Sequence, residues 1–380
     1  MKQIYLDNAA TTKPDPAVVD AMLPYLKDNY GNPSSLYSIG QQNKTAINNA
    51  REKVASVIGA NSNEIFFTSG GSESDNWVIK CIAKPGDHII TSKIEHHAIL
   101  NACKYMESCG VEVTYLDVDE NGMVNPKDVE NAIKYHTVLI SIMFANNEIG
   151  SIEPIKEIGE IAERHCVWFH TDAVQAFGHI PIDVNDLGID LLSCSAHKLN
   201  GPKGVGALYI KEREQGQIRS LIHGGGQEFG KRASTENVPG IVGFGAAAEL
   251  AKENMNQNIL YERKLTQMLL ELIIDDIPGV KFNGVQFDDR RLSNNLNISI
   301  DGIRGEELMI LLSMNGCYVS TGSACNSGDD KPSYVLKAIG LSDEEANSSI
   351  RITISKDTTM DDAIIFVEIL KLCVDQLRMK

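Results

Sequence analysis

The sequence predicts an α/β protein, with a mostly parallel sheet in a large domain and a smaller α+β domain after it. Two observations carry this prediction. Short apolar runs that end in polar or small residues alternate with stretches of helical periodicity through the first part of the chain. The pattern then changes to a long helix, a strand-rich segment and a final amphipathic helix. At roughly 150 residues per domain, a length of 380 residues agrees with two domains.

The predicted strands of the large domain are short and continuously apolar, which is typical of strands buried on both faces of a parallel sheet. They span residues 64–69, 88–91, 111–116, 138–145, 167–171 and 191–195. Helical spacing between them predicts helices over 42–58 and 155–164; the first places Ile47, Ala50, Val54, Val57 and Ile58 on one face. We expect this domain to cover residues 14–255.

The smaller domain is predicted over residues 256–380, together with residues 1–13. The change begins near Ala246, within a helical stretch at 241–274 that ends before Pro278 and Gly279. Further elements are predicted as a strand at 296–300, a helix at 305–314, a strand at 349–353 and a helix at 361–377, whose apolar stripe marks a buried face.

Composition excludes several classes of protein. The 35 Lys and Arg residues against 51 Asp and Glu residues leave a net charge of −16, which argues against a nucleic-acid partner. The longest apolar runs are far shorter than the ~18 residues of a spanning helix, and residues 1–8 do not form a signal peptide. The eight cysteines form no CxxC pair, so neither a zinc site nor a disulfide scaffold is indicated. We therefore expect a cytoplasmic protein that does not bind membranes.

A glycine-rich segment at residues 68–74 follows a predicted strand and opens a helix. Glycines allow close approach of an anion, and free N–H groups at a helix N-terminus bind phosphate. We expect Gly71 and Ser72 in this cradle, with Ser72 also capping the helix through a capping box to Asp75. A plain turn with a helix cap remains the alternative.

Two further residues follow strand ends, where α/β proteins bind ligands. Asp172 is suited to hold a proton on a heteroaromatic nitrogen, or else to cap a helix. Lys198, among small and apolar neighbours, is suited to Schiff-base chemistry, whereas Lys203 lies in a Gly/Pro turn that desolvates an amine poorly. A phosphate cradle, a carboxylate and a lysine in this order are what pyridoxal 5′-phosphate requires.

Four other elements complete the candidate site. His96 is suited to stack on a flat cofactor and shuttle protons, or to cap the following helix. Arg232 and Thr235 follow three consecutive glycines and are candidate phosphate contacts. Cys325 stands in a polar, glycine-rich loop, as expected of a nucleophilic thiol. Arg351 interrupts an apolar strand and needs an anion, either a substrate carboxylate or a structural ion pair.

The chain resembles the cysteine desulfurases of the NifS/IscS type, in the class-V aminotransferase group of fold-type I pyridoxal-phosphate enzymes. Matching segments occur in the family's order along nearly the whole chain. They include YLDNAATT (5–12), TSGGSESDN (68–76), EHHAIL (95–100), NNEIG (146–150), HTDAVQ (170–175), SAHKLNGPKGVGALY (195–209), RASTENVPG (232–240) and STGSAC (320–325). The resemblance implies a mostly parallel, seven-stranded type of sheet in the large domain.

The resemblance also implies roles for individual residues. Lys198 would hold the cofactor covalently, His96 would stack on its ring, and Asp172 would bind the pyridine nitrogen. Cys325 would form the persulfide. The other implied cofactor contacts are Gln175 at the phenolic oxygen, Asn147, and Gly71, Ser72, Ser195 and His197 at the phosphate, with Thr235 from the second subunit of a homodimer. Asn147 and Arg351 would bind the carboxylate of the substrate.

The implied activity converts L-cysteine to L-alanine and delivers the sulfur from Cys325 for iron–sulfur cluster assembly or thio-cofactor synthesis. Six residues separate Cys325 from Pro332, which resembles the long-loop class that serves iron–sulfur scaffold proteins. No metal is expected, although the sequence leaves open whether Cys325 ever ligates a cluster. The alternatives are a selenocysteine lyase, another class-V enzyme, and a catalytically idle sulfur-relay subunit.

Overall fold

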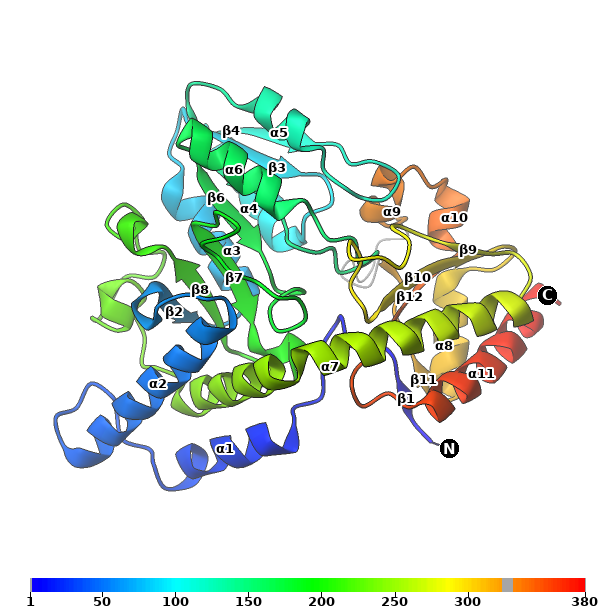
Figure 1. Ribbon diagram of the computed structural model, residues 1–380, viewed down its shortest axis with the longest axis horizontal. Helices are drawn as coiled ribbons and strands as arrows, with labels where there is room; N and C mark the ends of the chain where they lie inside the picture. The colour runs from blue at the N-terminus through cyan, green and yellow to red at the C-terminus, as the bar shows by residue number, and fades with distance from the viewer. Residues whose placement is uncertain (1, 323–330, 380) are drawn as a thin grey trace.

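A seven-stranded sheet forms the centre of the larger part of the molecule (Figure 1). The computed structural model describes residues 2–322 and 331–379. The strand order is β2-β8-β7-β6-β5-β3-β4, and only β8 runs antiparallel to its neighbours. The strands are β2 (Ile65–Thr68), β3 (His88–Ser92), β4 (Glu112–Leu116), β5 (Thr137–Ser141), β6 (Trp168–Asp172), β7 (Leu191–Ser195) and β8 (Gly206–Ile210). The predicted α/β class is confirmed.

Two details differ from the prediction. Strand β5 ends at Ser141 rather than at residue 145, although Ile142 and its successors are buried. Strand β8 was not predicted. Its connection from β7 is short and contains the 3-10 helix η2 (Ala196–Lys198), and so short a connection returns the chain antiparallel to the preceding strand.

Helices cover both faces of this sheet. Consecutive strand residues point to opposite faces. Phe66 therefore packs in one core cluster with Trp77 of α3 (Gly71–Ile82), whereas Phe67 packs in another with Phe244 of α7 (Val238–Asp276). The helices of this part are α1 (Pro16–Lys27), α2 (Ser38–Val57), α3 (Gly71–Ile82), α4 (His97–Ser108), α5 (Pro126–Ala132) and α6 (Ile155–His165), with η1 (Ser62–Glu64), η3 (Glu212–Glu214) and η4 (Glu228–Gly230).

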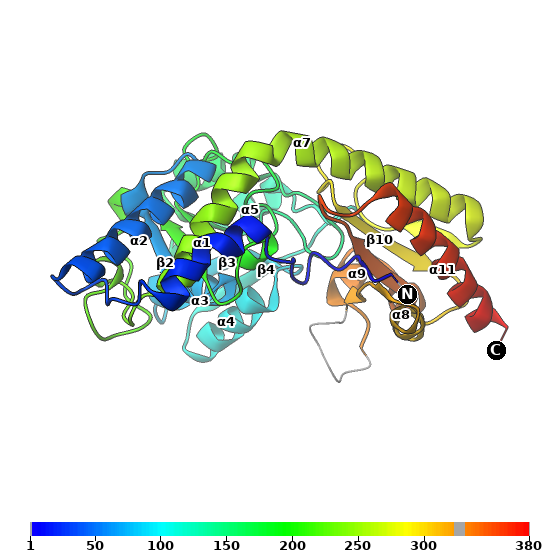
Figure 2. The same ribbon diagram turned by 90° about the horizontal axis from the view of Figure 1, so that it is seen from below.

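The 39-residue helix α7 (Val238–Asp276) runs from the larger part into the smaller part (Figures 1 and 2). The predicted boundary at 255/256 falls inside this helix, and it stays a prediction. The smaller part has its own apolar core around the antiparallel sheet β12-β10-β9. Its elements are β9 (Val280–Phe282), β10 (Asn295–Ile300), α8 (Gly305–Met314), β11 (Cys317–Tyr318), α9 (Tyr334–Ala338), α10 (Asp343–Asn347), β12 (Ser349–Thr353) and α11 (Met360–Arg378).

The N-terminal segment connects the two parts. Strand β1 (Ile4–Tyr5) pairs with β11, and Leu6 is fully buried in the smaller core. The chain then passes the carboxyl ends of the large sheet, where Thr12 N donates to the carbonyl oxygen of His197 at 2.9 Å. Among the described residues, no helix combines the length and the apolar character that crossing a membrane requires.

Candidate active site

A cavity of about 310 Å³ lies at the carboxyl ends of β6 and β7, beside the N-terminus of α3. Ligands of open α/β sheets bind at this edge, because the connections that follow the strands diverge there. Ten residues predicted from the sequence line the cavity. They are Gly71, Ser72, His96, Asn147, Asp172, Gln175, Ser195, His197, Lys198 and Arg351.

The turn from β2 into α3 leaves the first turn of the helix open to the cavity. Gly70 is the N-cap residue with φ +153°, a conformation that L side chains rarely adopt, and no side chain caps the helix. The predicted capping box is wrong: Ser72 lies inside the helix and is exposed, and Asp75 is buried instead of reaching back to the helix start. Uncapped N–H groups at a helix N-terminus are suited to bind a phosphate.

Asp172 is the last residue of β6 and is 5% exposed. Its Oδ1 accepts a hydrogen bond from Val174 N at 2.9 Å. Burial raises the pKa of Asp172, whereas His96, the bond from Val174 and Lys198 act to lower it. The carboxylate lines the cavity, and burial, the largest of these effects, leaves its pKa above the usual value.

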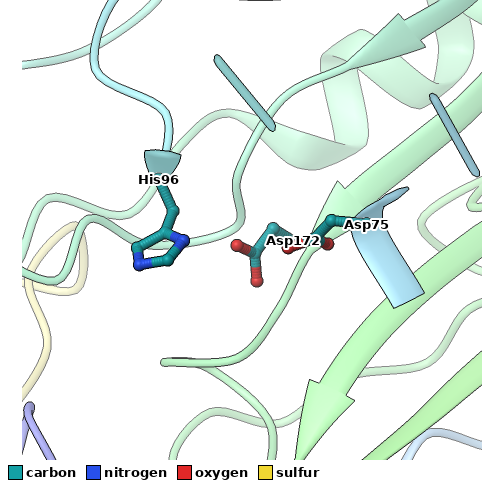
Figure 3. Close-up of side chains that lie close together, drawn as sticks. All are labelled: Asp75, His96 and Asp172. Carbon is teal, nitrogen blue, oxygen red and sulfur yellow. The ribbon is translucent and has the colours of Figure 1, made fainter. Parts of the chain in front are cut away.

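His96 lines the cavity and is the N-cap of α4. Its Nδ1 accepts from Ala98 N at 3.1 Å, so the capping alternative from the sequence is confirmed. Burial lowers the pKa of His96, which favours the neutral ring, and the bond from Ala98 N to Nδ1 leaves Nε2 as the nitrogen that carries the proton of that ring. Figure 3 shows the His96 ring and Asp172 side by side, with Asp75 beyond. One ligand atom from each of the three lies within 4.8 Å of the others.

Lys198 ends η2, directly after β7. Its Nζ donates to the carbonyl oxygens of Ala9 and Ala10, the latter at 2.8 Å. These two alanines also line the cavity, and Gln175 Nε2 donates to the Ala9 carbonyl at 3.0 Å. The N-terminal segment thus binds the amine through two backbone carbonyl oxygens.

Arg351 lies on β12 of the smaller part and is 5% exposed. Its Nη2 is paired with Asp7 Oδ1 at 2.7 Å, and its Nη1 donates to the carbonyl oxygen of Asn147 at 3.2 Å. The structural ion pair that the sequence left open is therefore present. Arg351 nevertheless lines the cavity, so its guanidinium is accessible to an anionic ligand.

Two predicted site residues are not in this cavity. Thr235 is exposed and does not line it. Arg232, the other candidate phosphate contact, forms an ion pair with Glu73, with Nε to Oε1 at 2.8 Å. Cys325 lies outside the described residues. The predicted roles of these residues stay predictions.

Sequence reasoning missed Ala9, Ala10 and Asp75. The two alanines belong to the YLDNAATT segment, which carried the resemblance but no assigned role, because a backbone carbonyl leaves no signal in a residue pattern. Asp75 was assigned to a helix cap. Burial raises its pKa well above the usual range, and the neighbouring charge of Asp172 raises it further.

The fold and the cavity define an α/β enzyme with a lysine, a carboxylate and an anion cradle at one strand edge. The model of the aminotransferase class-V family matches residues 4–366. The chain therefore belongs to the class-V aminotransferase family, and within it to the group of the NifS/IscS-type cysteine desulfurases.

Among its relatives, the chain is similar to the cysteine desulfurase IscS of Clostridium botulinum (strain Hall), at 55% identity over 99% of this chain and 96% of the relative. Among solved structures, a NifS-like protein superposes with a TM-score of 0.92 at 38% identity, covering 99% of this chain and all of the other. The structure described as SspA in complex with cysteine has a TM-score of 0.83 at 39% identity, covering 94% of this chain and all of the other.

Proposed function

We propose that this protein is a pyridoxal-phosphate-dependent cysteine desulfurase, a sulfurtransferase that converts L-cysteine to L-alanine and leaves the sulfur as a persulfide on Cys325. The observation that carries the proposal is the convergence of Lys198, Asp172 and the open N-terminus of α3 on one cavity. Membership of the class-V family and the names of the relatives support it.

The residues of the cavity fit pyridoxal phosphate. The uncapped first turn of α3, with Gly71 and Ser72, would hold the phosphate together with Ser195 and His197. Asp172 would hold the ring nitrogen and His96 would stack on the ring, while Gln175 and Asn147 would contact its edge. When bound through Lys198, this cofactor supplies an electron sink for the carbon atoms of an amino acid.

The residues of this chain then have separable tasks. Arg351 and Asn147 bind the carboxylate of L-cysteine, which competes with Asp7 for the guanidinium. Lys198 takes the α-proton of the substrate. The Cys325 thiol attacks the substrate sulfur, so the carbon–sulfur bond breaks and a sulfur–sulfur bond forms. The balance is L-cysteine plus thiol to L-alanine plus persulfide, with no external oxidant.

The first experiment is to measure L-alanine and sulfide released from L-cysteine with a thiol reductant, for the wild type and for Cys325→Ala. We expect equal amounts of both products from the wild type. The variant should release sulfide at least tenfold more slowly, because only the dissolved thiol remains to accept sulfur. Matching rates would make Cys325 an incidental thiol. A preference for selenocysteine over L-cysteine would favour a selenocysteine lyase. A protein that binds the cofactor but does not turn over L-cysteine would contradict L-cysteine as the substrate.

We also propose a homodimer. Of the 22 exposed large apolar side chains among the described residues, seven fall within residues 19–39, on α1, the start of α2 and their connection. So dense an exposed apolar surface marks an interaction site. Figures 1 and 2 place α1 and α2 at the end of the molecule away from the smaller part. Thr235, exposed and outside its own chain's cavity, is free to contribute to the cavity of a second copy.

Light scattering coupled to chromatography tests the dimer. We expect the wild type at twice the chain mass of 41.6 kDa, and Leu26→Glu/Leu36→Glu at the chain mass. These side chains are 61% and 93% exposed, so the substitutions leave the core intact, whereas two charges in an interface must be desolvated. Leu372→Glu is the matched control at 69% exposure on α11, and it should stay dimeric. A monomeric wild type would contradict the proposal.

We also propose that this protein lies in the cytoplasm and that an iron–sulfur scaffold protein accepts its sulfur. The seven cysteines in the described part of the chain are all free thiols. Free thiols are typical of a reducing compartment. The acceptor is inferred from the resemblance to desulfurases with a long segment around the persulfide cysteine, and co-purification of a cysteine-rich acceptor that accumulates sulfane sulfur would support it.

A further inference from the structure

Glu148 is a buried carboxylate next to Asn147 that has no task in the function proposed above. It lies in the connection between β5 and α6 and is 3% exposed. Its N–H donates to Asn146 Oδ1 at 2.8 Å, and its carbonyl oxygen accepts from the side chains of Asn295 and Asn297 on β10. Glu148 is therefore fixed between the larger and smaller parts of the molecule.

The Glu148 side chain contacts a residue on each side of the segment in which Cys325 stands. On the C-terminal side, Ser333 Oγ donates to Glu148 Oε2 at 2.5 Å. On the N-terminal side, a Cβ added to Gly322 would overlap the same oxygen and lie 2.8 Å from Ser333 Cβ. One carboxylate oxygen thus accepts from Ser333 and lies against Gly322, and residue 322 has no room for a side chain.

Two neighbours of Glu148 favour its charged form despite its burial. Burial raises the pKa of Glu148 to about 7, whereas the bond from Ser333 and the nearby charge of Arg351 act to lower it. A buried carboxylate costs free energy unless it is bonded and paired, and these two neighbours offset part of that cost. The same residue therefore links the segment ends to the side of the cavity where the substrate carboxylate is proposed to bind.

We propose that Glu148 is a positioning residue for sulfur transfer: by bonding Ser333 and packing against Gly322, it fixes the two points of the chain between which Cys325 lies. The inference rests on the proposed function, because Cys325 accepts sulfur only in that reaction. Errors of about 1 Å in the placement of a reacting group cost up to about 100-fold in rate, so loss of this anchor slows persulfide formation without removing a reactive group.

Four variants of the holoenzyme test this role: E148A, S333A, the double variant, and the conservative E148Q. We expect E148A and S333A each to lower kcat for alanine formation about tenfold, with KM for L-cysteine within about twofold of the wild type. The double variant should be no slower than E148A alone, because both substitutions remove one contact. E148Q keeps an amide oxygen for Ser333 and should stay within about threefold of the wild type.

Ser333 also caps α9, since Leu336 N donates to its Oγ at 3.2 Å. The matched control is S342A, which removes the serine cap of the neighbouring helix α10, where Glu345 N donates to Ser342 Oγ at 3.1 Å. We expect S342A to lower the unfolding temperature as S333A does, without lowering kcat. Equal losses of kcat in the two serine variants would reduce the Ser333 effect to helix capping and overturn the proposal.

Other outcomes also decide. A raised KM with unchanged kcat would mean that Glu148 acts on substrate binding through Arg351. Losses that multiply in the double variant would mean that Glu148 and Ser333 act independently. If E148A does not fold, the comparison of kcat between S333A and S342A tests the proposal on its own. A wild type that makes no alanine from L-cysteine would contradict the proposed function, whereas an active wild type with unaffected variants contradicts only the role of Glu148.

Discussion

Replacing Lys198 by alanine should lower the conversion of L-cysteine to L-alanine by about 10⁴-fold or more, the largest loss expected for any single substitution in this chain. Lys198 combines two tasks in the proposal, covalent attachment of the cofactor and movement of the α-proton. Its amine donates to the backbone oxygens of Ala9 and Ala10, which also line the cavity. Alanine formation and retention of cofactor absorbance through gel filtration measure the two tasks.

The control for this experiment is Lys203→Ala. Lys203 stands five residues further on, in the Gly/Pro turn after η2, and its side chain is exposed. It should keep full activity and bound cofactor. Loss of activity in Lys203→Ala together with an active Lys198→Ala would show that the attachment residue was assigned wrongly.

Much of the fold follows from the sequence because its elements are regular and their periodicity is undisturbed. Helix α8 begins and ends at the predicted residues, and β7 does as well, since each is bounded by residues that change the pattern abruptly. Strand β8 was missed for a physical reason. Its GALYI sequence directly follows the glycine-containing turn around Lys203, so its short apolar run gave no separate sign of where the strand begins.

The candidate site was predictable as far as residue type and strand ends determine it. Asp172 and Lys198 lie at the carboxyl ends of adjacent parallel strands, and the topology alone brings such ends together. Asp75 was misassigned because the S-x-x-D spacing occurs both in a capping box and within a helix. The spacing fits a capping box, but the N-cap residue is Gly70, two residues before Ser72, so Ser72 lies inside the helix, and Asp75 is buried.

Contacts made by backbone atoms and by the second part of the molecule could not be predicted from the sequence. The ion pair of Arg351 with Asp7 joins residues at opposite ends of the chain, and nothing in either local pattern indicates the partner. In the proposed function, a substrate carboxylate at Arg351 would replace or join Asp7 at the guanidinium, and the ion pair with Asp7 would re-form when the substrate leaves.

Asp172→Asn is expected to lower kcat/KM for L-cysteine by about 10²- to 10³-fold and to weaken cofactor binding. Asparagine keeps the shape and the bond from Val174 N but removes the negative charge at the atom that would hold a protonated ring nitrogen. The charge matters because Asp172 is only 5% exposed, and the effective dielectric constant around a buried group is low. Cofactor titration followed by absorbance and steady-state kinetics measure both effects.

The matched control is Asp190→Asn, since Asp190 is also buried, at 6% exposure, but lies at the opposite end of the sheet, just before β7. It accepts a hydrogen bond from Phe169 N at 3.1 Å and pairs with Arg213 at 3.3 Å. Loss of the Asp190 charge should lower the unfolding temperature and leave cofactor affinity unchanged. Asp190 lies at the amino end of β7, whereas the cavity lies at the carboxyl ends of the strands. If both variants lose the cofactor equally, the effect of Asp172→Asn is structural; if only Asp172→Asn does, the carboxylate at the end of β6 acts on the cofactor directly.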